Sequence, residues 1–232
     1  LRELSDSGVR VVFCTNNSRS TVDEYVSKLT SMGVDVAPED ILTSGLVTAR
    51  VLAQRGFAGR KAIVVGGAGV SAALAAEGIE VVDDPKSTEC DAVVVGWDPD
   101  FDYDRLRRAA TAVRDGALLI ATNADATFPA QDGLWPGAGA ILAAIETASG
   151  ARAEVMGKPN PPTADAIEVL VDGTCHVACI GDRPDTDLAL GIAKGWLRIL
   201  VLSGVTREED VPAIDPQPDH VIASIADIGS IR

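Results

Sequence analysis

Short apolar segments alternate with amphipathic segments along nearly the whole chain, and this alternation limits the possible folds more than any other feature. Residues 61–66 and 92–96 are typical apolar segments, and each ends in a polar or glycine-containing turn. Runs of this length and composition are typical of buried parallel strands, and the segments between them have helical spacing. The pattern therefore predicts an α/β fold with a parallel sheet and with polar turns at the carboxyl ends of its strands.

The alternation also restarts once within the chain, which predicts two interleaved α/β units. A second series begins after Gly59, and the first pattern returns near Arg152. The predicted strands are 10–14, 61–66, 80–82, 92–96, 118–122, 153–157, 176–180, 198–202 and 220–222. The predicted helices are 21–32, 38–55, 70–77, 103–114, 140–148, 163–171 and 188–194, with a loop at 123–139.

The net charge narrows the classes of partner. The formal charge is −14 at pH 7, which repels nucleic-acid backbones and anionic membrane surfaces at long range. Aromatic residues make up only 4% of the chain, too few for a base-stacking platform. We therefore expect neither a nucleic acid nor a membrane as partner, whereas a small phosphate ester held by a metal ion stays compatible with this charge.

The cysteines indicate a reducing compartment. The four of them are Cys14, Cys90, Cys175 and Cys179, and no two form a Cys-x-x-Cys pair. With only two histidines in the chain, this argues against a zinc site. The sequence shows no signal peptide and no apolar run of the ~18 residues that a membrane span requires. We expect a cytoplasmic protein.

The most informative turn is Gly181-Asp182-Arg183-Pro184-Asp185-Thr186-Asp187, between a predicted strand and a predicted helix. Hard oxygen donors on such a turn suit Mg²⁺, which takes one or two protein carboxylates and leaves its other positions to water and phosphate. In the alternative reading, Asp185 caps the next helix and Asp182 merely ends a strand. The turn alone favours neither reading.

Two further turns carry polar side chains at predicted strand ends. Thr15, Asn16 and Asn17 offer a hydroxyl, two amides and successive backbone N–H groups, which could hold a phosphoryl group or could instead cap the following helix. Lys158 lies between a glycine and a proline, where it could neutralise charge on a transferring phosphoryl group. Considered alone, it would be read as a surface lysine.

The glycine-rich sequence 66–69 follows a predicted strand and opens a helix, which suggests a dinucleotide site. Its spacing differs from Gly-x-Gly-x-x-Gly, because position 71 is Ser71. A strand-to-helix turn that needs glycine for structural reasons is the better reading. A nicotinamide-dependent enzyme therefore remains only a third candidate function.

In combination, the polar turns resemble a known family. The Thr-Asn turn at 15–17, the Gly-Lys-Pro sequence at 157–159 and the Gly-Asp-Arg-x-x-Thr-Asp sequence at 181–187 resemble the second, third and fourth motifs of the haloacid dehalogenase (HAD) superfamily. The sequences at 121–125 and 136–139 resemble its subclass IIA, which contains the 4-nitrophenylphosphatases, NagD-like proteins, and phosphoglycolate and glycerol-phosphate phosphatases. The resemblance covers nearly the whole chain.

This resemblance implies a Rossmann-like core with a large inserted α/β cap. The core would comprise residues 1–58 and 153–232, and the cap residues 59–152. The implied activity is Mg²⁺-dependent hydrolysis of small phosphate monoesters through an aspartyl-phosphate. The implied partner is a small phosphorylated metabolite, and a homodimer formed through the cap is compatible with the family.

The resemblance also assigns roles to single residues. Thr15, Asn16 and Asn17 would bind the phosphate, and Lys158 would bridge the phosphate and the nucleophile. Asp182 would ligate Mg²⁺, and Asp187 would orient Lys158 or a metal-bound water. Asn123 and Asp125, on a cap loop, could read substrate hydroxyls, although a role in stabilising the turn is equally compatible with the sequence.

One element of the family pattern does not occur. The Asp-x-Asp-Gly motif, whose first aspartate is the nucleophile, is absent from the 232 residues. We therefore expect the first core strand to be missing and the sequence to be an N-terminally truncated fragment that is itself inactive. The alternative is a catalytically silent HAD-like protein that binds a phosphorylated ligand or a protein.

Overall fold

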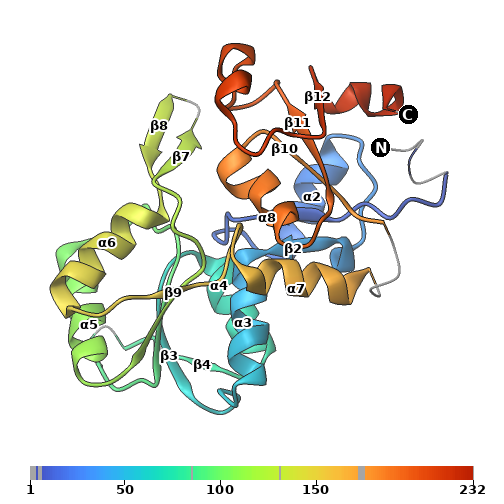
Figure 1. The fold of residues 1–232 in the computed structure, drawn as a ribbon. Coiled ribbons are helices and arrows are strands. Elements are labelled where there is room, and N and C mark those ends of the chain that lie inside the picture. The colour runs from blue at the N-terminus through green and yellow to red at the C-terminus, as the bar shows by residue number, and fades with distance from the viewer. Residues whose placement is uncertain (1–3, 5–6, 85, 131, 172–175, 232) are drawn as a thin grey trace. The chain divides into compact units, whose positions relative to one another are not determined.

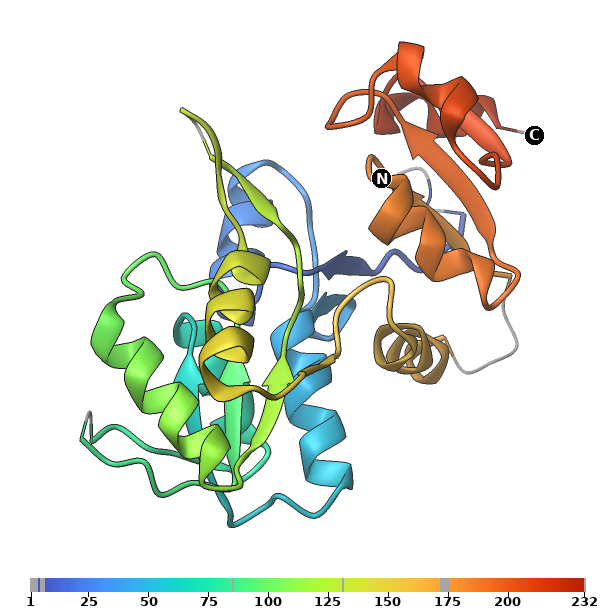
Figure 2. The same ribbon diagram turned by 60° about the vertical axis from the view of Figure 1, so that its left-hand side comes forward.

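The computed structural model describes residues 4, 7–84, 86–130, 132–171 and 176–231 (Figure 1, Figure 2). The chain divides into two compact units, Leu1–Gly157 and Lys158–Arg232. The predicted α/β class is confirmed, because every sheet except one hairpin is parallel.

A five-stranded parallel sheet is the largest element of the first unit. Its strands lie in the order β4-β3-β5-β6-β9. Their bounds are β3 Lys61–Val65, β4 Glu80–Val81, β5 Ala92–Val95, β6 Leu118–Ala121 and β9 Glu154–Val155. The chain moves from β3 to one neighbour and then crosses to β5 on the other side of β3. The crevice between the carboxyl ends of β3 and β5 is therefore a topological switch point, where open α/β sheets usually bind ligands.

Helices cover both faces of this sheet (Figure 1, Figure 2). The helices α5 and α6 lie on one face and α3 and α4 on the other. Their bounds are α3 Ser44–Gln54, α4 Ala68–Ala76, α5 Tyr103–Arg114 and α6 Ala138–Ser149. Because side chains alternate along a strand, Ile63, Val93 and Leu119 pack against α5 and α6 in the core between sheet and helices. Burial on both faces explains why these strands are continuous apolar runs.

A two-stranded parallel sheet, β1-β2, completes the first unit. It pairs Phe13–Thr15 with Ile41–Thr43, and Thr15 lies opposite Thr43. Between the two strands lie α2, Val22–Ser31, and a short 3₁₀ helix η1, Pro38–Asp40. Thr21 begins α2 with a capping box, since its hydroxyl accepts from the Glu24 N–H and the Glu24 carboxylate accepts from the Thr21 N–H.

Two predictions of local structure are wrong. The stretch 38–55 is not all helical, because the short buried strand β2 interrupts it. Residues 123–139 are not all loop, because they contain the antiparallel hairpin β7-β8, Thr127–Ala130 and Gly133–Pro136. Pro129 and Pro136 argue against a central strand, but a two-stranded ribbon has only edge strands, which tolerate proline.

The second unit contains a three-stranded parallel sheet in the order β10-β11-β12. Its strands are Ala178–Gly181, Leu197–Val201 and His220–Ile222. Its helices are α7 Pro161–Leu170, a π-helical turn η2 Pro184–Leu188, α8 Ala189–Ile192, and the 3₁₀ helices η3 Glu208–Ala213 and η4 Ile225–Ser230. The π turn lies within the acidic sequence at 181–187. Single π-helical turns occur frequently at functional sites.

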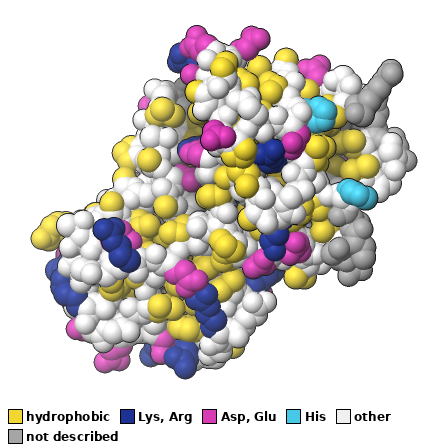
Figure 3. Space-filling view, in the orientation of Figure 1, with side chains coloured by type: hydrophobic (Ala, Val, Ile, Leu, Met, Phe, Trp, Pro, Cys, Tyr) yellow, Lys and Arg dark blue, Asp and Glu magenta, His cyan; other side chains and the backbone are white. Residues whose placement is uncertain are grey.

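Three features concern the expected location and partners. Among the described residues, no helix is both long enough and apolar enough to cross a membrane. Cys14, Cys90 and Cys179 are present as thiols, and Cys175 lies outside the described residues. On the face shown in Figure 3, Lys and Arg side chains are interspersed with Asp and Glu side chains.

Candidate active site

The predicted phosphate turn follows β1 and is held in shape by local hydrogen bonds. The Asn17 N–H donates to Thr15 Oγ1 over 3.1 Å, and the Arg19 N–H donates to Asn17 Oδ1 over 3.1 Å. The Tyr25 hydroxyl, from α2, donates to the Asn17 carbonyl over 2.9 Å. Burial raises the pKa of Tyr25, and a hydrogen bond with the Thr15 side chain offsets part of that effect. Tyr25 therefore stays a neutral donor at neutral pH.

Asn16 is only 8% exposed and is held by residues distant in sequence. Its carbonyl accepts from Ser44 Oγ over 2.7 Å and from Asn123 Nδ2 over 2.8 Å. Its own amide Nδ2 donates to the carboxylate of Asp125, at 3.1 Å from Oδ1 and 3.2 Å from Oδ2. The structure thus brings Asn16 of the predicted phosphate turn together with the two predicted specificity residues, Asn123 and Asp125.

In the second unit, Lys158 forms a largely buried ion pair with Asp187. Lys158 Nζ lies 2.7 Å from Asp187 Oδ1, and the two side chains are only 11% and 13% exposed. The other carboxylate oxygen, Oδ2, accepts from the Arg183 N–H over 3.1 Å. Gly181 is required here, since a Cβ at that position would overlap the Asp187 carboxylate. Asp187 therefore fixes the lysine ammonium on the acidic turn.

Asp182, at the carboxyl end of β10, is held by the loop that follows β11. Its Oδ2 accepts from the Val205 N–H over 2.7 Å, and its carbonyl accepts from Thr206 Oγ1 over 2.6 Å. A Cβ at Gly204 would overlap the Asp182 carboxylate, so glycine is needed for this approach. Sequence reasoning missed residues 204–206, and the only local signal for them was a Ser-Gly pair after a predicted strand.

Comparison with known proteins gives consistent matches. A family model described as haloacid dehalogenase-like hydrolase matches residues 1–80, and a HAD-hydrolase-like model matches residues 155–228. The acid sugar phosphatase of Staphylococcus aureus strain USA300 is 36% identical over 218 residues, covering 94% of this chain and 83% of the relative. The chain belongs to the haloacid dehalogenase-like hydrolases. Within this family it is a member of subclass IIA, a group of phosphoric monoester hydrolases.

Solved structures of the family agree with this membership. The p-nitrophenyl phosphatase from Archaeoglobus fulgidus has a TM-score of 0.89 and 31% identity, covering 99% of this chain and 88% of that one. The glycerol phosphate phosphatase from Mycobacterium tuberculosis, solved in complex with calcium, has a TM-score of 0.87 and 33% identity. The match covers 95% of this chain and 66% of that one. Haloacid dehalogenase-like phosphatases generally use a divalent metal, and this neighbour was solved with calcium.

The donors of the acidic turn fit such a metal. Asp185 forms an ion pair with Arg183 at 3.1 Å, and Asp187 is taken by Lys158, so Asp182 is the carboxylate of this turn suited to a metal. Val205 occupies Asp182 Oδ2, which leaves Oδ1 as the candidate ligand atom. In the described part of the chain, no cluster of three or more His, Cys, Asp or Glu residues could hold a metal. One carboxylate with phosphate and water suits Mg²⁺ better than a closed site.

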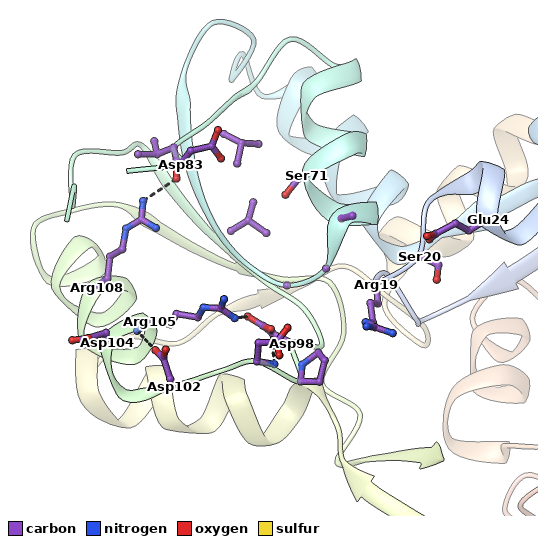
Figure 4. Close-up of a pocket in the computed structure, with 18 residues that line it drawn as sticks. Arg19, Ser20, Glu24, Ser71, Asp83, Asp98, Asp102, Asp104, Arg105 and Arg108 are labelled. Carbon is purple, nitrogen blue, oxygen red and sulfur yellow. Dashed lines mark hydrogen bonds and ion pairs between the residues drawn. The ribbon is translucent and has the colours of Figure 1, made fainter. Parts of the chain in front are cut away.

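The first unit also has an open cleft of about 760 Å³ at the switch point between β3 and β5 (Figure 4). Arg19, Ser20 and Glu24 line one side, and Asp98 and Arg105 lie on another, joined by an ion pair of 2.7 Å. None of the predicted site residues lines this cleft.

The glycines beside the cleft have a structural role. A Cβ at Gly67 would overlap Arg19, and one at Gly69 would overlap the carbonyl oxygen of Ser20. The Gly69 N–H, at the start of α4, donates to the Arg19 carbonyl over 2.8 Å. The protein's own backbone thus occupies the helix terminus where a dinucleotide phosphate would bind. This contact argues against the nicotinamide reading.

The sequence analysis also missed several residues that hold the phosphate turn. Ser18 Oγ and Thr122 Oγ1 lie 2.9 Å apart, and both side chains are completely buried. The guanidinium of Arg19 lies 5.5 Å from the ring centre of Trp97, which stacks on Phe128 of the hairpin. The members of each pair are distant in sequence, so no local pattern could reveal them.

Proposed function

We propose that this chain is part of a Mg²⁺-dependent phosphatase, which hydrolyses small phosphate monoesters through an aspartyl-phosphate. The buried ion pair of Lys158 and Asp187 carries this proposal. Burying two charges is costly, and an apolar pair of similar volume would often be as stable. A fixed ammonium at the carboxyl end of a parallel strand is instead what a site for a transferring phosphoryl group requires.

The roles follow from the chemistry of each side chain. Thr15 donates a hydrogen bond to a phosphoryl oxygen, and Asn16 and Asn17 complete the cradle with the backbone N–H groups of the turn. Lys158 neutralises the charge that develops on the phosphoryl oxygens. Asp187 positions Lys158, and Asp182 holds the metal. When bound, Mg²⁺ would supply further stabilisation of negative charge on the phosphoryl group.

The nucleophile must come from elsewhere. The family's Asp-x-Asp-Gly motif does not occur in the 232 residues, so we propose that the reactive aspartate lies outside them. An aspartate carboxylate attacks phosphorus and the P–O bond to the alcohol breaks, with a proton going to the leaving oxygen. Water then hydrolyses the acyl phosphate, which releases orthophosphate and restores the carboxylate.

We propose the family's cap as residues 59–152, with residues 1–58 and 153–232 as the core. The five-stranded sheet supports the first boundary, since it begins at Lys61, but its last strand, Glu154–Val155, lies beyond the proposed second boundary. The compact units divide instead after Gly157, which agrees with the many bonds between the turn at 16–20 and the ends of that sheet. A homodimer through the cap remains part of the proposal.

The substrate class follows from the relatives. Proteins named acid sugar phosphatase and glycerol phosphate phosphatase are among them, so small sugar and polyol phosphates are the first esters to test. The protein would act in the cytoplasm, where thiols such as Cys14 and Cys90 stay reduced.

The test compares the 232-residue chain with a longer chain that carries an Asp-x-Asp-Gly motif. With 4-nitrophenyl phosphate and Mg²⁺, we expect no useful turnover by the former and Mg²⁺-dependent turnover by the latter. In the longer chain, Lys158→Ala should lower kcat about a hundredfold or more even at saturating metal. Asp182→Asn keeps the side-chain volume but removes the charge, so its activity should recover partly at high Mg²⁺.

Two outcomes would contradict the proposal. Turnover by the 232-residue chain that Asp182→Ala abolishes would show that the missing motif is not needed. Near-parental turnover by both Lys158→Ala and Asp182→Asn would show that the roles are wrong. An inactive longer chain that still binds phosphorylated ligands would favour the catalytically silent binding protein.

A further inference from the structure

The side chains of Asn123 and Asp125 both point to one residue of the phosphate turn. We propose that they are positioning residues, which hold Asn16 and thereby keep the turn at residues 15–17 in its phosphate-binding geometry, and that they do not read the leaving group. This inference rests on the proposed role of Asn16 in phosphate binding. It places the carboxyl end of β6, within the predicted cap, among the elements that build the phosphate site.

The contacts fix both the backbone and the side chain of Asn16. Asn123 Nδ2 donates to its carbonyl from the loop after β6, and Ser44 Oγ donates to it from α3. Asp125 accepts from its amide Nδ2 with both carboxylate oxygens. The local hydrogen bonds of the turn act on its neighbours Thr15 and Asn17. The long-range partners therefore decide where the Asn16 amide points.

Asp125 is itself held firmly enough to act as an anchor. Its N–H donates to Asn123 Oδ1 over 3.1 Å, which closes a turn directly after β6. Its carbonyl accepts from the Gly139 N–H over 2.9 Å, at the start of α6. Gly137 and Gly139 allow this approach, since a Cβ at either position would overlap the backbone of residues 124 and 125. The anchor is thus part of a rigid strand-to-helix connection.

Burial makes these hydrogen bonds consequential. Asn16 is 8% exposed and Asn123 is 3% exposed. Losing one partner in such an environment leaves a polar group without compensation, which costs far more than losing the same bond in water. An Asn16 side chain without its acceptor would turn towards another partner, and the turn would lose its phosphate geometry.

Electrostatics gives a test that separates this role from others. Asp125 carries a negative charge close to the turn that is proposed to bind a phosphate dianion. If that charge were its main effect, any neutral substitution would strengthen phosphate binding. If Asp125 acts as an acceptor for Asn16, a neutral residue that keeps the acceptor oxygen preserves binding, whereas one that lacks it weakens binding.

The experiment measures the affinity of the 232-residue chain for inorganic phosphate with Mg²⁺ present, by titration calorimetry. The matched pair is Asp125→Asn and Asp125→Ala, which both remove the charge but differ in the acceptor. We expect Asp125→Asn to bind phosphate at least as tightly as the parent and Asp125→Ala to bind about tenfold more weakly. Asp104→Ala is the control, since that side chain is 88% exposed, and it should bind as the parent does.

Each result decides a separate point. Equal affinity of the Asn and Ala variants, whether unchanged or increased, overturns the positioning role. If Asp125→Ala leaves the phosphate affinity unchanged but alters the preference among esters in the longer chain, Asp125 recognises the substrate and does not position Asn16. Hydrogen exchange at residues 15–20 should be faster in Asp125→Ala than in Asp125→Asn, and equal rates would contradict the inference. A parent chain that binds no phosphate overturns this inference, whereas the proposed function is decided separately by Mg²⁺-dependent turnover of the longer chain.

Discussion

The charged residues of the acidic turn differ sharply in burial. Lys158 and Asp187 form a pair that is almost fully enclosed, whereas Asp185, paired with Arg183, is 66% exposed. An enclosed charge depends on its partner because it has lost most of its hydration, while an exposed charge is compensated by water. The same turn therefore contains one pair that should matter greatly for folding and one that should matter little.

We predict that Asp187→Ala lowers the free energy of unfolding by about 3 kcal/mol, because it removes the carboxylate that lies 2.7 Å from the enclosed Lys158 ammonium. Urea denaturation of the 232-residue chain measures this. Asp185→Ala is the matched control on the same turn and should change stability by less than about 0.5 kcal/mol. The double variant Lys158→Met with Asp187→Leu should recover most of the loss. Equal effects of the two aspartate substitutions would contradict the burial argument.

At the scale of elements, the first turn of α4 is shaped by its contact with the phosphate turn. Gly69 lies in this helix, where alanine would ordinarily be favoured by up to about 1 kcal/mol. A Cβ at Gly69 would overlap Ser20 O and would lie 2.6 Å from Ser18 O, both of which are backbone atoms. The fit between two elements therefore overrides the helix propensity of a single residue.

We predict that Gly69→Ala destabilises the chain by about 2 kcal/mol, the opposite sign from its effect on an isolated helix. Gly229→Ala is the control, since a Cβ at Gly229 meets no atom within 4 Å. It should be neutral or slightly stabilising in thermal unfolding. A Gly69→Ala variant as stable as the parent would show that residues 18–20 do not lie against α4 in solution.

At the scale of the whole molecule, the protein carries a large net negative charge. Several of its carboxylates are nevertheless more stable as anions in the folded protein than in the unfolded chain. The formal charge is −14, and the isoelectric point is about 4.5. Arg198 lowers the pKa of Asp219, to which it donates from its guanidinium and its backbone N–H. A hydrogen bond from Arg55 lowers the pKa of Glu154, and the Ala153 N–H lowers that of Glu146.

We predict that acid destabilises the protein through these carboxylates. Their folded pKa values lie below the ordinary values of 3.8 for Asp219 and 4.5 for the glutamates. The stability that they contribute is therefore complete above about pH 5 and is lost as the pH falls through the folded values. Melting temperatures between pH 7 and pH 3 measure the loss.

The Asp219→Asn variant isolates one contribution. It should be less stable than the parent at pH 7, and the difference should shrink as the pH falls, because the parent then loses the same charge. Asp115→Asn, at the end of α5, is the control for a general charge effect. If the difference in melting temperature between Asp219→Asn and the parent stays constant from pH 7 to pH 3, the Asp219 carboxylate does not contribute to the acid sensitivity.

The sequence by itself determined the class of fold and the chemical types in the site. Apolar runs such as 92–96 and 118–122 were predicted as strands and are β5 and β6, because burial on both faces of a parallel sheet leaves a continuous apolar signature. The bounds of α5, 103–114, were also predicted, because its helical periodicity is long and its start is capped by Asp102. Family membership was likewise readable from short motifs.

Only the tertiary structure decided which residues meet. The hairpin β7-β8 and the strand β2 were missed because short or proline-containing strands carry little periodicity, and their pairing supplies most of their stability. Residues 204–206 hold Asp182, and Asn123 and Asp125 hold Asn16, although nothing local marks these partners. A sequence pattern reports the environment of a residue's own element. Contacts between the carboxyl ends of different strands depend on how those strands are ordered in space.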